Sequence, residues 1–205
     1  GNLVSDASIG VFESFANGAV DGRFAVGRNS LLVLGDKDSA WAQKAVQDAL
    51  DNADLTWGKD SVTAALAIKS SQKLSATGAL LVDGSLATAP SVTENTATFA
   101  GQSLLVVNAA AADGEGALQG DGTSRLSVDG GAKLHIMDVK GSQEYTVTSG
   151  FVNDKIEGWQ GDDLIVSRLF NAAVNTDGGK FVVKTEAKRP DEFSQYAIPN
   201  ILAAI

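Results

Sequence analysis

The sequence predicts a mainly β protein: a parallel β-helix (solenoid) with one helical insertion and a C-terminal antiparallel hairpin cap. The first observation is a repeated motif, in which a glycine, one to three small or polar residues and an aliphatic run follow one another. It occurs at 27–33, 101–107 and 131–137, with a shortened copy at 78–82. Such recurrence is typical of a stacked array, whose units bury their apolar sides against their neighbours. The second observation is composition, because 22 glycines and only three prolines suit short strands joined by many turns.

The strands are too short and too closely spaced for a doubly wound α/β fold, which needs regular intervening helices. An antiparallel sandwich remains the alternative, and the repeated motif favours the solenoid over it. We therefore expect residues 55–150 to form stacked strands with these side chains pointing inward: Leu74, Leu81, Val106, Leu126, Val128, Leu134 and Ile136.

The first predicted unit, residues 1–163, is the solenoid. Its residues 9–34 read as short strands separated by glycine-containing turns. The helical insertion is expected near 38–53, because several N-cap candidates precede 40–53 and the apolar residues there fall on one side of a helix. We interpret that helix as an amphipathic segment laid on the sheet rather than as a binding feature.

The second predicted unit, residues 164–187, is the hairpin cap. Asp-Gly-Gly within 176–179 favours a tight turn, because these residues tolerate positive φ. A two-stranded ribbon is barely stable alone, so the hairpin should pack on the last solenoid rung. Its apolar side chains are Val166, Phe170, Val174, Phe181 and Val183. Residues 188–205 read as a linker and the start of a helix, so the sequence reads as a piece of a larger protein.

Net charge and composition argue against several classes of partner and site. The net charge of −9 and the lack of a basic stripe argue against nucleic acid or an anionic membrane surface. The absence of cysteine rules out disulfides and thiolate sites. No apolar run approaches the roughly 20 residues of a membrane-spanning helix, and the first residues do not resemble a secretory signal.

No residue is predicted to be catalytic, to bind a cofactor or to bind a metal. His135, the single histidine, lies between two residues expected in the core and should face solvent. Ser70 and Lys73 spell Ser-x-x-Lys without its companion motifs. The acidic turns at 113–116, 120–122 and 162–163 match no calcium-loop pattern and read as solvated turns. Carboxylates that could cleave sugars are candidates by residue type only: Asp36, Asp38, Asp162 and Asp163.

Residues 126–151 combine a strand, an Asp-Gly turn, Ala-x-Leu, a second strand and Gly-x-x-Tyr-Thr. This style resembles the repeats of bacterial autotransporter passengers, and 158–164 with the following hairpin looks like the autochaperone-type cap before their membrane barrel. The resemblance covers roughly residues 60–186. It implies a β-helix carried outside a Gram-negative cell and anchored through an outer-membrane translocator barrel of the same parent chain. It implies no catalytic residues.

The leading hypothesis is a structural, non-enzymatic passenger segment of a surface protein that supports folding, secretion and display. An alternative is an adhesin or glycan-binding module, in which a lateral face of the solenoid binds a host or cell-surface glycan or protein. A third is a β-helical glycan-active enzyme, which would need two carboxylates about 5–10 Å apart in a groove.

Overall fold

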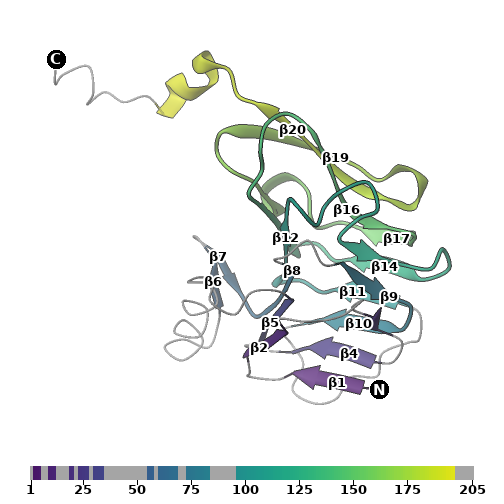
Figure 1. Cartoon of the computed structure of the whole chain (residues 1–205). Coiled ribbons are helices and arrows are strands. Elements are labelled where there is room, and N and C mark those ends of the chain that lie inside the picture. The colour runs from purple at the N-terminus through teal and green to yellow at the C-terminus, as the bar shows by residue number, and fades with distance from the viewer. Residues whose placement is uncertain are drawn as a thin grey trace.

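The computed structural model describes residues 2–5, 9–12, 19–20, 23–27, 30–34, 55–57, 60–68, 73–83 and 96–196. Over these residues the protein is mainly β, and most strands lie in three six-stranded sheets, largely parallel (Figure 1). The only helical segments there are short 3-10 turns: η1 (Gly161–Asp163), η2 (Asp177–Gly179) and η3 (Pro190–Tyr196). The helix expected near 38–53 lies outside the described residues, as do residues 197–205.

The three sheets divide the strands as follows. Sheet A holds, in spatial order, β1 (Asn2–Ser5), β4 (Arg23–Val26), β10 (Ala79–Val82), β11 (Thr96–Phe99), β14 (Arg125–Val128) and β17 (Val152–Ile156). Sheet B holds β18 (Leu164–Ile165), β15 (Lys133–Met137), β12 (Ser103–Asn108), β8 (Ala64–Ile68), β5 (Ser30–Leu34) and β2 (Ile9–Phe12). Sheet C holds β19 (Phe170–Asn175), β20 (Phe181–Ala187), β16 (Glu144–Ser149), β13 (Leu118–Gln119), β9 (Leu74–Ala76) and β3 (Ala19–Val20). A separate antiparallel pair joins β6 (Leu55–Trp57) and β7 (Asp60–Val62).

The chain visits the sheets in a fixed rotation. From β11 to β18 it passes through sheets A, B and C in turn, and each strand pairs in parallel with the strand of the preceding round. The rotation is interrupted twice, where β5 is followed by β8 in sheet B and β10 by β11 in sheet A. Figure 1 shows the result as strands of sheet A stacked from β1 to β17.

One hydrophobic core runs between the sheets, built from ladders of equivalent side chains. In sheet B the register stacks Leu32 on Leu66, Leu105, Leu134 and Leu164. In sheet A it stacks Val82, Phe99 and Val128. All but Leu164 are essentially inaccessible to solvent. Each buried aliphatic side chain contributes about 1.5–3 kcal/mol relative to its exposed state.

Sheet B also buries its outer face. A second cluster, which we call the outer cluster, lies on that face and is fully buried: Leu31, Val33, Val62, Ala65, Ala67, Leu104 and Val106. Val62 comes from β7, so the β6–β7 pair supplies part of this layer.

The outer cluster corrects one sequence expectation, and sheet A corrects another. Val106 is buried in the outer cluster instead of the central core, because it alternates with the inward-facing Leu105 and Val107. Leu81 is partly exposed, because Leu80 and Val82 on either side of it take the core positions. The other five side chains expected to point inward do lie in the central core.

An antiparallel hairpin ends the three-sheet body. β19 pairs with β20, and β20 pairs with β16, so the hairpin extends sheet C. The turn falls at η2, where Gly178 and Gly179 have φ of 64° and 72°. The hairpin begins at Phe170 rather than at residue 164, because Leu164 and Ile165 instead form β18, in parallel register with Leu134 and His135.

Candidate functional site

Three aromatic rings fill the core at its C-terminal end. Trp159 lies between Phe99 and Phe181, with ring centroids 4.7 Å and 5.3 Å away and edge-on geometry in both pairs. All three side chains are fully buried. Phe99 comes from sheet A and Phe181 from sheet C, while Trp159 lies in the connection from β17 to β18. This aromatic cluster therefore joins sheet A and sheet C through the β17–β18 connection, where the parallel strands end.

The backbone places Trp159 at some conformational cost. Its φ is 60°, a left-handed conformation that a large side chain rarely adopts. The Trp159 N–H donates to the Ala132 carbonyl over 2.9 Å. Gly158 before it lies so close to the preceding turn that a Cβ would approach the carbonyls of Asp129 and Ala132 to 2.4 and 2.6 Å. Only glycine fits at position 158, and this close backbone approach lets Trp159 turn into the core.

The indole N–H of Trp159 has no acceptor among the described residues, although the atom is fully buried. An unsatisfied buried donor costs about 1–3 kcal/mol. The ring therefore holds its place through apolar contact alone. The sequence reasoning did not single out Trp159, and the signal that could have found it is a bulky aromatic directly after a glycine and shortly before a second one, Gly161.

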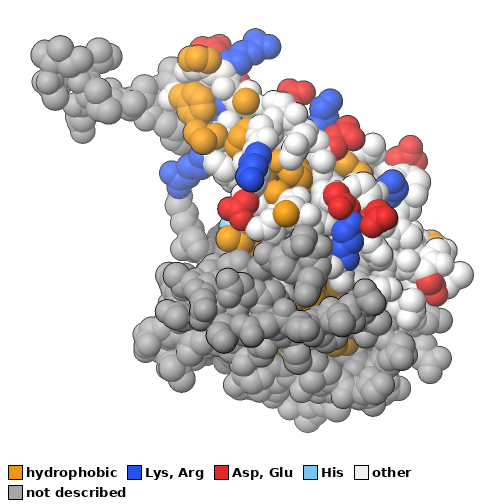
Figure 2. All heavy atoms as spheres, viewed as in Figure 1, with side chains coloured by type: hydrophobic (Ala, Val, Ile, Leu, Met, Phe, Trp, Pro, Cys, Tyr) orange, Lys and Arg blue, Asp and Glu red, His pale blue; other side chains and the backbone are white. Residues whose placement is uncertain are grey.

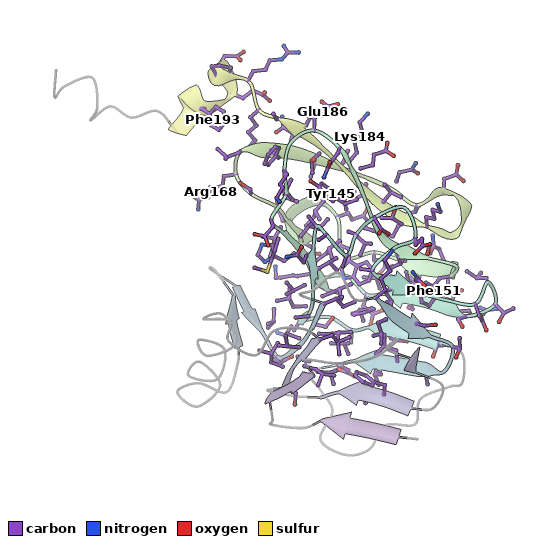
Figure 3. All side chains as sticks on the ribbon, viewed as in Figure 1. Tyr145, Phe151, Arg168, Lys184, Glu186 and Phe193 are labelled. Carbon is purple, nitrogen blue, oxygen red and sulfur yellow. The ribbon has the colours of Figure 1, made fainter. Side chains whose placement is uncertain are left out.

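Polar contacts fasten the hairpin over this end. Thr185 is fully buried; its hydroxyl donates to the Gly141 carbonyl over 2.8 Å, and its N–H donates to the Gln143 carbonyl over 2.9 Å. At the turn, the Asn153 amide donates to the Thr176 carbonyl over 3.1 Å. Figure 3 shows Tyr145 on the covered side of the hairpin and Lys184 and Glu186 projecting from its other side. The hairpin is thus held at both ends as well as by its apolar face.

A lateral depression lies at the corner between sheets B and C. It has a volume of about 660 Å³ and is lined by Asn108, Ala109, Ala110, Asp138, Val139, Lys140 and Gln143. The Asn108 amide donates to the Asp138 carboxylate over 2.7 Å and accepts the Ala110 N–H over 2.8 Å. This network fixes the orientation of both side chains. The depression offers a carboxylate, amides and an ammonium group within one solvent-exposed hollow.

The acidic turns carry structural contacts. Asp113 pairs with Lys73, which also lies 3.1 Å from Glu115, and the hydrogen bond from Lys73 lowers the pKa of Asp113. Burial tends to lower the pKa of Lys73, but its bonds to the two carboxylates raise it overall. Asp121 accepts four hydrogen bonds from Thr123 and Ser124 within its turn, which lower its pKa.

The remaining sequence candidates lie apart from one another. Asp163 accepts the Gly131 N–H over 3.1 Å and lies 3.6 Å from Lys133, so it ties two successive turns together. Asp162 is exposed in η1, and His135 lies on the outer side of β15, partly exposed. Asp36, Asp38 and Ser70 lie outside the described residues. Among the residues that the structure describes, no three His, Asp or Glu side chains gather as potential metal ligands.

Comparison with known proteins gives no relative. A scan against family models, a search of curated proteins and a search of solved structures found no match to this chain. Within the described ranges, no helix has the length and apolar character needed to cross a membrane.

Proposed function

We propose that the three sheets are the sides of one parallel β-helix and that the aromatic cluster and the hairpin cap its C-terminal end. The rotation of strands through sheets A, B and C supports this, as do the ladders of equivalent side chains. Repeat arrays need atypical end units, because the last unit would otherwise expose its core. The burial of Trp159, Phe181 and Val183 where the parallel strands end fits that requirement.

On this basis the protein is a non-enzymatic structural segment of an autotransporter-like surface protein, joined to an outer-membrane barrel of its parent chain. Its role is to start passenger folding on the outer side of the membrane and to hold distal regions away from the cell. The observation that carries this proposal is the aromatic cluster beneath the hairpin. It joins strands of sheets A and C through the β17–β18 connection at one end, so this end can form a stable template onto which further rungs stack.

Native-state hydrogen exchange tests whether the C-terminal end is the most stable part of the protein, as a folding template must be. Amides in β12 to β16 and in β20 should exchange most slowly, and protection should fall toward β1, because rungs depend on their neighbours. In a Phe181→Ala variant, protection should drop across β16, β17 and β20 before it drops elsewhere. Faster exchange in β16 and β20 than in β4 and β5 of the unmodified chain would contradict a nucleating role.

Secretion tests the cellular role. The chain is fused to a translocator barrel and produced in a Gram-negative host, and protease is then added to intact cells. The unmodified chain should be accessible outside, while Phe181→Ala should reduce the folded, protease-resistant amount on the surface. Leu169→Ala is the matched control, because Leu169 is a large hydrophobic residue near the hairpin but is 59% exposed. Equal surface folding of Phe181→Ala and the unmodified chain would contradict the proposal.

A second candidate function is glycan binding, and the corner depression favours it. Its volume lies in the range of small-molecule sites, about 300–1,000 Å³. Asp138 and Lys140 offset each other in charge, and with Asn108 and Gln143 they present both donors and acceptors, which suits a neutral polyhydroxylated ligand. Titration of the labelled chain with neutral oligosaccharides should shift amide resonances around Asp138, and Asp138→Ala should abolish the shifts. Asp154→Ala, on the distant strand β17, is the control.

A further inference from the structure

The outer edge of β19 is a strand edge open to pairing. β19 is the last strand of sheet C, and among the described strands only β20 pairs with it. The N–H of Lys188 donates to the Leu169 carbonyl over 2.9 Å, which marks these opposed residues as a hydrogen-bonded pair. Because such pairs alternate along an antiparallel ladder, the backbone groups of Phe170, Ala172 and Val174 point away from β20. The Phe170 N–H donates to the Ser167 carbonyl over 3.0 Å, so the open part of the edge is centred on Ala172 and Val174.

Three of the other five ends of the described six-stranded sheets are poor pairing edges, and the remaining two, β1 and β2, are strands of only four residues. β17 carries Asp154 and Lys155 and breaks register against β14, while β18 and β3 have two residues each. Charges, bulges and shortness are the usual means by which proteins block strand addition. β19 has none of these features: it is six residues long, carries no charged side chain and keeps its register throughout. Figure 2 shows hydrophobic side chains at the surface over this end of the molecule.

We propose that β19 is a homodimer interface, in which two copies of the chain pair through antiparallel β19 strands about a two-fold axis at Ala173. This register places Ala172 opposite Val174 of the second copy, so that outward-pointing backbone groups meet. Ala173 then faces Ala173, and Asn171 faces Asn175. The strand reads Asn-Ala-Ala-Val-Asn about this centre, so amides oppose amides and small apolar residues oppose one another.

The two asparagines are complementary in their remaining hydrogen-bonding groups. The Asn171 Nδ2 donates to Glu192 over 2.7 Å, which leaves its Oδ1 as an acceptor. The Asn175 Oδ1 accepts the Asp177 N–H over 3.1 Å, which leaves its Nδ2 as a donor. In the proposed register, Asn175 of each copy can donate to Asn171 of the other. The symmetric pairing would form this bond twice.

The chemistry at the axis favours a closed dimer over a filament. A head-to-tail array that continues sheet C would pair β19 with β3, at the other end of that sheet, and β3 offers only two residues. Ala173 is exposed and small, so two copies can approach to the Cα separation of about 4.5 Å found in non-hydrogen-bonded pairs.

Each copy carries a net charge of −9, so the two copies repel each other. Added salt screens this repulsion and should strengthen the association.

Sedimentation equilibrium with charge-swap variants tests the interface. The unmodified chain should dimerise, and Ala173→Lys and Ala173→Glu should each weaken the dimer about fivefold or more, because like charges would meet at the axis. Mixing the two variants in equal amounts should restore association, because lysine then faces glutamate. Ala110→Lys is the matched control, an exposed alanine outside both strands of the hairpin, and should dimerise normally.

Three results would overturn the inference. The first is an unmodified chain that stays monomeric at millimolar concentration in both low and high salt. The second is a dimer that Ala173→Lys leaves unchanged. The third is a mixture of the two variants that does not associate, although circular dichroism shows that both are folded. The dimerisation test does not depend on the proposed passenger role, because the hydrogen-exchange and secretion measurements test that role separately.

Discussion

Replacing Trp159 with alanine should lower the free energy of unfolding by about 3–5 kcal/mol. The ring is fully buried, and burying the roughly 150–250 Å² of such a side chain contributes about 4–6 kcal/mol at 25 cal/mol per Å². The edge-on contacts with Phe99 and Phe181 add about 0.5–1.5 kcal/mol each. The unpaired indole N–H takes back about 1–3 kcal/mol. The sum of these contributions agrees with the loss in free energy of unfolding that is typical when a large buried aromatic side chain is truncated to alanine.

Trp159→Phe is the control that separates ring burial from the indole N–H. Phenylalanine keeps an aromatic ring between Phe99 and Phe181 and removes the unpaired donor, so the loss should be about 1–2 kcal/mol. Urea unfolding followed by far-ultraviolet circular dichroism measures both variants without relying on tryptophan fluorescence. A loss below about 1 kcal/mol for Trp159→Ala, or a larger loss for Trp159→Phe than for Trp159→Ala, would refute the reasoning.

Three further changes should have distinct effects. Gly120→Ala should destabilise the fold by about 1–3 kcal/mol, because its Cβ would lie 2.4 Å from the Gly150 carbonyl, whereas Gly114→Ala, in open space, should be neutral by thermal unfolding. Asp121→Ala should lower the melting temperature at neutral pH. Because folding lowers the pKa of Asp121, its stabilisation is present above about pH 4 and decreases progressively as the pH falls below that value. A deficit in melting temperature that does not shrink as the pH falls below about 4 would contradict this. Thr185→Val should cost about 0.5–1.5 kcal/mol in urea unfolding, since it removes the hydrogen bond from the hydroxyl to the part-buried Gly141 carbonyl.

The sequence was most informative where a local pattern determines local structure. Asp-Gly-Gly at 177–179 indicated the hairpin turn, and both glycines there do have positive φ. The start of the hairpin could not be found in the same way. Leu164 and Ile165 read like any other strand residues, and only the stacking of Leu164 over Leu134 assigns them to sheet B.

The candidate site was less predictable, because its residues meet only through stacking. Asn108 and Asp138 lie 30 positions apart and touch because successive turns are superimposed at the B–C corner. Phe99 and Phe181 are brought to Trp159 from different sheets. No spacing rule within one segment reports such contacts. They follow from the register of each round on the next, which depends on the lengths of all the intervening turns.

The outer cluster shows a signal that the sequence did contain. β5, β8 and β12 are apolar at nearly every position, and a strand without alternation indicates burial on both faces. β15, the next strand, alternates instead: Leu134 and Ile136 are buried, while His135 is only partly so. The change from unbroken to alternating runs therefore marks where the second layer on sheet B ends. Because Val106 belongs to an unbroken run, its hydrophobicity could not tell which face it occupied; only its position relative to Leu105 could.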